Sequence, residues 1–178
     1  MATKRRSSID ASTSDILRTV GILAGVLALL ALFFTATRPD PRLPDTVDYE
    51  AALEHVRAEY PYPVLAPASL PDGWRATSVD YSSTDRGNRW RLGFLIGESG
   101  YVGLEQSDGE IMSYLASRLS DFREDGTVTI EGDEWERRIQ QDRSPDRALV
   151  RIDDGVVTIV RGPEPYEVLE SFAADLES

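Results

Sequence analysis

The feature that most constrains this chain is a long apolar run near its N-terminus. Residues 16–34 read ILRTVGILAGVLALLALFF, and Arg18 is the only charged residue among them. As a helix, the uncharged stretch over residues 19–37 is about 28 Å long, close to the roughly 30 Å thickness of the hydrocarbon core of a bilayer. The run therefore predicts a single transmembrane helix over residues 16–37.

Two other interpretations of this run are a buried core helix and a cleaved signal peptide. A core helix normally has a polar face, and a signal peptide has a shorter apolar region that ends at an A-x-A-like site. Here the run is long and is followed by TAT at residues 35–37. The basic residues KRR at positions 4–6 predict that residues 1–15 form a cytoplasmic tail. The chain is accordingly expected to be a single-pass plasma-membrane protein, most of which lies outside.

Composition limits the chemistry that the chain can perform. Its 178 residues include no Cys and one His, with 19 Lys and Arg against 31 Asp and Glu, a net charge of -12. The absence of Cys excludes disulfides, thiolate metal sites and cysteine nucleophiles. The negative charge argues against a nucleic-acid partner, because phosphate binding needs concentrated positive charge.

The remainder of the chain divides into a short stalk and one domain. Residues 38–46, RPDPRLPDT, contain three prolines and predict an extended stalk. Residues 47–178 are expected to form one extracytoplasmic domain. Helical spacing of apolar residues occurs over 47–60, 111–122 and 165–177, and strand patterns occur over 74–81, 89–96, 101–106, 127–130, 134–141, 148–153 and 156–160. This order predicts an α+β fold with an antiparallel sheet packed by helices.

No catalytic constellation is found in the sequence. His55 falls on the polar face of the helix expected over residues 47–60, beside Glu59, and is interpreted as a solvated residue and not as a general base. The chain has no GxSxG elbow, P-loop, dinucleotide fingerprint or HExxH motif. No catalytic, cofactor-binding or metal-binding residue is therefore predicted, no cofactor is expected, and the chain is expected not to be an enzyme.

Carboxylates are the most abundant candidate site residues. The densest cluster consists of Glu131, Asp133, Glu134 and Glu136. Converging carboxylates could bind Ca²⁺ or hydrolyse a glycoside. This cluster, however, surrounds a predicted hairpin turn and lacks calcium-loop spacing, so we interpret it as a solvated turn. The DDG sequence at residues 153–155 has the same interpretation.

Aromatic and basic residues offer two further candidates. The three tryptophans are Trp74, Trp90 and Trp135. They could stack on a sugar or cap a lipid pocket, but large aromatic residues in strands usually build the core. Arg89 and Arg91 flank Trp90 on the opposite strand face, and Arg137 and Arg138 follow Trp135. A basic patch at these arginines is the alternative to ordinary pairing with nearby carboxylates.

Several short motifs together resemble a known family. They are LPDGW at residues 70–74, WxxGF at 90–94, YVGLEQS at 101–107, GxxW at 132–135, ALVR at 148–151 and FAxxL at 172–176. Their order resembles that of an uncharacterised actinobacterial family, the domain of unknown function numbered forty-two forty-five, whose members have one N-terminal membrane helix. The resemblance extends from Ile16 almost to the end of the chain. It implies a membrane protein of the cell envelope and supplies no activity, cofactor or catalytic residue.

Three functional hypotheses follow. The first is a non-enzymatic envelope protein whose outer domain binds an envelope protein or another envelope component. The second is a domain that binds a lipid or small apolar ligand between its sheet and helices, which an internal apolar cavity would favour. The third is a carboxylate-dependent hydrolase of envelope glycans, which two facing carboxylates in a cleft would favour.

Overall fold

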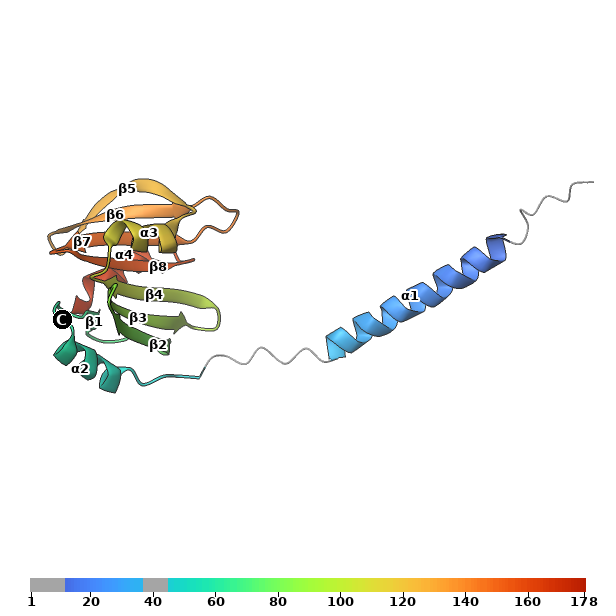
Figure 1. The fold of residues 1–178 in the computed structure, drawn as a ribbon, viewed down its shortest axis with the longest axis horizontal. Coiled ribbons are helices and arrows are strands. Elements are labelled where there is room, and N and C mark those ends of the chain that lie inside the picture. Colours follow the sequence, from blue (N-terminus) through green and yellow to red (C-terminus); the bar gives the residue numbers. More distant parts are fainter. Residues whose placement is uncertain (1–11, 37–44) are drawn as a thin grey trace, which may run out of the picture. The chain divides into compact units, whose positions relative to one another are not determined.

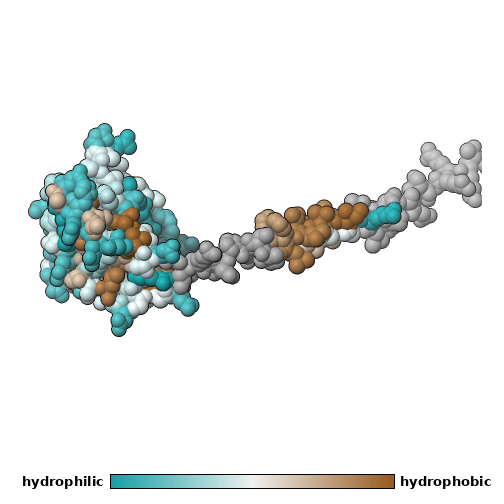
Figure 2. All heavy atoms as spheres, turned by 90° about the horizontal axis from the view of Figure 1, so that it is seen from below, coloured by the Kyte–Doolittle hydropathy of each residue, from teal (hydrophilic) through white to brown (hydrophobic). Residues whose placement is uncertain are grey.

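The computed structural model describes residues 12–36 and 45–178, and the chain divides into two compact units, Met1–Arg42 and Leu43–Ser178. Helix α1, Ser12–Ala36, belongs to the first unit. Its apolar side chains are exposed, as the brown surface of this helix in Figure 2 shows. The predicted stalk over residues 38–46 lies largely outside the described residues, as does most of the predicted tail over residues 1–15.

The transmembrane helix predicted over residues 16–37 is wrong. In the part of the chain that the structure describes, no helix combines the length and the mean hydropathy that a membrane crossing requires. The stretch of α1 without polar side chains covers only residues 20–34, between Thr19 and Thr35. Such a stretch is about 22 Å long as a helix, shorter than the roughly 30 Å hydrocarbon core. The plasma-membrane location, which the structure does not test, stays a prediction.

The second unit is an α+β domain built on a seven-stranded antiparallel sheet (Figure 1). The strands are β2 (Trp74–Thr84), β3 (Gly87–Ile96), β4 (Gly100–Ser107), β5 (Phe122–Ile130), β6 (Asp133–Gln140), β7 (Arg147–Asp153) and β8 (Val156–Gly162). Their order in the sheet is β2-β3-β4-β8-β7-β6-β5. Two meanders, β2 to β4 and β5 to β8, therefore meet where β4 pairs with β8. A separate two-stranded sheet pairs β1 (Ala66–Pro67) with β9 (Leu176–Glu177).

Helices cover both faces of the seven-stranded sheet. Helices α2 (Glu50–Glu59) and α4 (Tyr166–Ala174) contribute Val56, Leu169 and Phe172 to one core, which contains alternate strand residues such as Trp90, Phe94 and Leu149. We call this side the α4 face. Helix α3 (Ile111–Leu119) packs Leu115 and Leu119 on a smaller core on the opposite side, the α3 face. The period-2 alternation of strand side chains thus supplies two cores from one sheet.

The proline-rich segment before β2 is fastened to the α4 face by buried polar side chains. The Gln106 side chain accepts a hydrogen bond from the Leu65 backbone N–H at 2.7 Å, and its Nε2 donates to the Pro63 carbonyl at 3.3 Å. The Trp90 indole N–H donates to the Leu65 carbonyl at 3.0 Å. These bonds satisfy backbone groups of a segment that forms no regular secondary structure at these positions.

Some predicted helix boundaries differ from the observed ones. Helix α3 begins after Glu110, whose own carboxylate caps it by accepting hydrogen bonds from the N–H groups of Met112 and Ser113. The hydroxyl of Ser107 donates to the Asn88 carbonyl at 2.9 Å, and the helix begins at Ile111 as predicted. Phe122, expected to end the helix, begins β5.

Candidate functional site

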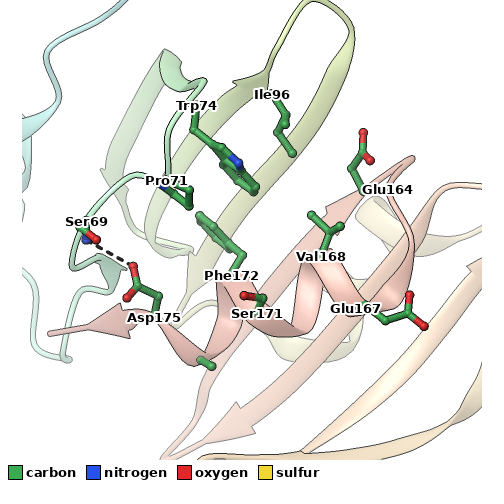
Figure 3. Close-up of a pocket in the computed structure, with 11 residues that line it drawn as sticks. Ser69, Pro71, Trp74, Ile96, Glu164, Glu167, Val168, Ser171, Phe172 and Asp175 are labelled. Carbon is green, nitrogen blue, oxygen red and sulfur yellow. Dashed lines mark hydrogen bonds between the residues drawn. The ribbon is translucent and has the colours of Figure 1, made fainter.

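A groove of about 630 Å³ lies on the α4 face, between α4 and the start of β2 (Figure 3). This volume is in the range of small-molecule sites. Four separate segments contribute to it: the loop before β2, the first residue of β2, the last residue of β3, and the region from residue 164 to residue 175. The lining residues are Ser69, Pro71, Trp74, Ile96, Glu164, Glu167, Val168, Ser171, Phe172, Ala174 and Asp175.

The floor of the groove is aromatic and aliphatic. The rings of Trp74 and Phe172 are stacked with centroids 5.6 Å apart and planes inclined by 5°. Ile96 is the register partner of Trp74 in the neighbouring strand. Trp74 is placed by a turn in which its N–H donates to the Pro71 carbonyl at 3.0 Å and Gly73 has a φ of +82°, a conformation that glycine adopts without strain.

Three carboxylates border this floor. Asp175 lies at the end of α4, where its Oδ2 accepts a hydrogen bond from the Ser69 N–H at 3.3 Å. Glu164 lies at the other end of the groove in Figure 3. A β carbon at Gly100 would come within 2.6 Å of its Oε1, so the Glu164 carboxylate lies directly against the β4 backbone. Glu167 is exposed on the first turn of α4.

These carboxylates have no basic partner in the structure of residues 45–178. None of the ion pairs of that region involves Glu164, Glu167 or Asp175. The groove also has no arginine or lysine in its lining. It therefore combines an apolar floor with uncompensated negative charge, an arrangement that favours a ligand with an apolar body and a positive group.

The candidate residues predicted from the sequence lie outside this groove, with one exception. The side chain of His55 is 57% exposed, and its Nε2 lies 3.1 Å from Glu59 on the same helix. Trp90 and Trp135 are fully buried, as expected for core residues. Trp74 is partly buried: it packs against the α4-face core, as expected, and it also forms the groove floor.

The acidic cluster and the arginines pair with one another along the sheet. Asp133 forms an ion pair with Arg151, and Glu136 pairs with Arg138 at 2.8 Å. Arg137 reaches Glu170 of α4 and lies over the ring of Tyr166 at 5.0 Å. Among the described residues, no group of three or more metal-binding side chains comes together. Asp133 and Glu136 therefore neutralise neighbouring arginines, whereas Glu131 and Glu134 are exposed and form none of the ion pairs found within residues 45–178.

A family model with the description "Protein of unknown function (DUF4245)" matches residues 9–176 of the chain. The chain belongs to the DUF4245 family. No curated protein and no solved structure matches it. The family resemblance of the sequence motifs is thereby confirmed, while the motifs themselves are structural: in this DUF4245 chain, LPDGW forms the turn into β2, and the tryptophan of WxxGF is buried in the core.

A periodic signal in this DUF4245 sequence could have identified the groove. Glu164, Val168, Ser171 and Asp175 are spaced by four, three and four residues, so they follow one stripe of a helical segment. This stripe lies beside the buried stripe that contains Phe172. A polar and acidic stripe adjoining a core stripe indicates a helix edge that lines a depression, but only the fold shows that Trp74 lies opposite.

Proposed function

We propose that the domain is a non-enzymatic binding module, and that the groove beside α4 takes a ligand with an apolar body and a positively charged group. The observation that carries this proposal is the presence, in the described domain, of three carboxylates without a basic partner around the stacked rings of Trp74 and Phe172. A basic peptide segment with a neighbouring aliphatic side chain has this chemistry.

Each part of the groove has a distinct role in this proposal. The Trp74 and Phe172 floor removes apolar ligand surface from water, which contributes roughly 25 cal/mol per Å² before ordering costs. The partly exposed indole of Trp74 also attracts a cation through its ring face. Glu164 and Glu167 lie at one end of the groove, so they would orient the positive group there.

The alternative functions fit the groove less well. Glycoside hydrolysis needs two carboxylates facing each other across the scissile bond, separated by roughly 5 to 9.5 Å. Figure 3 shows Glu164 and Asp175 at opposite ends of the groove, and Asp175 is already bound to the Ser69 N–H. A purely apolar ligand would desolvate the bordering carboxylates without providing a partner for them.

Tryptophan fluorescence of the full-length protein can test the proposal. Trp90 and Trp135 are buried, so a ligand in the groove should change mainly the emission of Trp74. We expect a short arginine–leucine peptide amide to change this emission, and the matched glutamate–leucine peptide to leave it unchanged. The double variant Glu164→Gln/Glu167→Gln should weaken binding about tenfold, equal to about 1.4 kcal/mol.

Two further variants make this experiment specific to the groove. Ser171→Phe should block binding, because it places a large side chain in the groove from an exposed position on α4 without adding a tryptophan. Glu54→Gln removes the same charge from the exposed side of α2 and should leave the affinity unchanged. Equal affinities for the two peptides would contradict the proposal. So would an equal loss of affinity for the arginine–leucine peptide in Glu54→Gln and in the groove variants.

A further inference from the structure

The core beneath α3 does not extend over the whole α3 face. The core beneath this helix consists of residues from β7 and β8, together with Phe122, and includes no residue of β2 or β3. Residues that are directly opposite one another in β2, β3 and β4 form rows across these strands. One row contains Arg75, Leu95 and Tyr101, and the next contains Ser78, Gly93 and Gly103. We use the name open face for the part of the α3 face that β2, β3 and β4 form.

Tyr101 forms the centre of the open face. Gly93 and Gly103 are directly opposite each other in β3 and β4. A β carbon at Gly93 would lie 2.8 Å from the Tyr101 hydroxyl, and one at Gly103 would lie 3.2 Å from the same atom. The two glycines therefore make room for the tyrosine ring, which lies over both of them and remains 39% exposed.

Arginines surround this tyrosine. Arg91, Arg118 and Arg161 interact electrostatically with its hydroxyl. Arg75 and Arg89 lie farther away on the same side of β2 and β3, while Arg118 and Arg161 come from α3 and β8. Arg89 and Arg91 share a single carboxylate oxygen of Asp80, at 3.2 and 3.1 Å. The guanidinium of Arg118 is paired with Glu105, and that of Arg161 lies 3.6 Å from Asp146.

Five arginines thus share three carboxylates, in a chain whose net charge is -12. Arg75 has no ion pair in residues 45–178, and its buried Nε and Nη2 atoms have no hydrogen-bond partner there. A guanidinium in this condition has unused donors, and the buried ones reach an oxyanion when the side chain turns outward. The open face is therefore a local excess of positive charge on an acidic protein.

We infer that the open face is a docking surface for an acidic segment of a partner polypeptide. Tyrosine and arginine are the residue types that dominate binding energy at protein interfaces, and the open face presents both around one exposed ring. Its charge is complementary to aspartate and glutamate side chains, which the unpaired Arg75 and the half-compensated Arg91 would bind. A nucleic acid is disfavoured because its dense phosphates would meet the strongly negative field of the whole chain.

This second surface is independent of the groove beside α4. The groove is acidic and lies on the α4 face, whereas the open face is basic and lies on the opposite side of the sheet. Opposite charges of the two surfaces mean that they select opposite kinds of ligand. Variants in one surface should therefore leave the affinity of the other unchanged.

Fluorescence anisotropy of a labelled short oligoglutamate peptide, titrated with the full-length protein, tests this inference. We expect binding that weakens as salt is added, and about a tenfold loss of affinity in Arg75→Gln. This substitution breaks no ion pair, so the fold should be retained. Arg75→Lys keeps the charge but not the forked donors of the guanidinium, so its loss of affinity for oligoglutamate should be smaller than that of Arg75→Gln.

Gly93→Ala provides a second variant that does not change charge. Its new methyl group would displace only the ends of the Ser78 and Tyr101 side chains, so the fold should persist while the tyrosine moves and affinity falls several-fold. Arg143→Gln is the matched control, because it removes one positive charge from the exposed turn between β6 and β7.

Three results would overturn the inference: no binding of oligoglutamate, equal losses in Arg75→Gln and Arg143→Gln, or tighter binding of a short oligodeoxythymidine than of oligoglutamate. Glu164→Gln/Glu167→Gln should bind oligoglutamate like the unaltered protein, and Arg75→Gln should bind the arginine–leucine peptide normally. If only one of the two peptides binds, only the corresponding surface is supported.

Discussion

The guanidinium of Arg118 on α3 holds the carboxylate of Glu105 on β4 with two hydrogen bonds, from Nε at 2.6 Å and from Nη2 at 2.5 Å. The two partners differ in exposure, because the Glu105 side chain is 6% exposed and that of Arg118 is 30% exposed. Tyr114 donates a third hydrogen bond to the same carboxylate at 3.0 Å. The hydrogen bonds to Glu105 are the main cause of the raised pKa of Arg118, so its guanidinium stays protonated.

This difference in exposure predicts an asymmetry between two variants. Arg118→Met leaves a buried carboxylate without its counter-ion and should cost about 3 to 5 kcal/mol of unfolding free energy. Glu105→Gln leaves an arginine that water can reach and should cost about 1 to 3 kcal/mol. Urea unfolding of both variants, with Tyr114→Phe as a milder control, measures this order. Equal costs or the reverse order would contradict the account.

Trp90 and His55 provide a second comparison. Trp90 is fully buried on the α4 face, so Trp90→Ala should destabilise the domain by about 3 to 5 kcal/mol. His55 is exposed on α2, and His55→Ala should change stability by less than about 0.5 kcal/mol. Thermal unfolding checks both values. A near-neutral Trp90→Ala would show that the α4-face core is not formed as described.

Two glycines should respond oppositely to the same substitution. A β carbon at Gly162 would lie 2.1 Å from the Tyr101 carbonyl oxygen, a backbone atom that cannot move without separating β4 from β8. Gly162→Ala should therefore prevent normal folding or lower the unfolding midpoint strongly. Gly93→Ala meets only side-chain ends and should be tolerated. Circular dichroism and urea midpoints of the two variants distinguish these outcomes.

The stability of the domain should decline at alkaline pH. Burial is the main cause that raises the pKa above the ordinary value of 10.0 for six tyrosines: Tyr49, Tyr60, Tyr62, Tyr101, Tyr114 and Tyr166. The folded state holds these protons more tightly, so its stability is complete below the unfolded pKa and falls as the pH rises through it. The urea concentration at the unfolding midpoint should decrease as the pH rises from about 9 to about 11. The absorbance of tyrosinate in the folded protein should appear at a higher pH than that of an ordinary tyrosine. Constant midpoints over this range would argue against buried hydroxyls.

The strands were more predictable from the sequence than the helix ends and the groove. Strict alternation over residues 89–96 predicted β3, because the side chains of Trp90, Leu92, Phe94 and Ile96 all face one core. The end of α3 was missed because Phe122 continues the apolar spacing of the helix although it starts a strand. The sequence shows only local periodicity, and this periodicity does not show at which residue a helix ends and the following strand begins.

The groove and the open face depend on contacts between distant residues. Trp74 stacks on Phe172 because β2 pairs with β3 in the sheet and α4, which follows β8 in the chain, packs over this side of the sheet. Similarly, Gly93 and Gly103 are unremarkable glycines in the sequence, and their role follows from the register that places Tyr101 over both. The pairing of Arg89 and Arg91 with Asp80, in contrast, followed the usual expectation for arginines near carboxylates.

The pairing of β4 with β8 sets the order of events when the domain folds. All other neighbouring strands of the seven-stranded sheet are consecutive in the chain and can form as hairpins, whereas β4 and β8 are separated by residues 108–155. Bringing them together requires the closure of a long loop, whose entropy must be lost before the contact is gained. We expect the two meanders to form early and the closure of their junction to be the rate-limiting step, so substitutions at this junction should slow folding more than those in either hairpin.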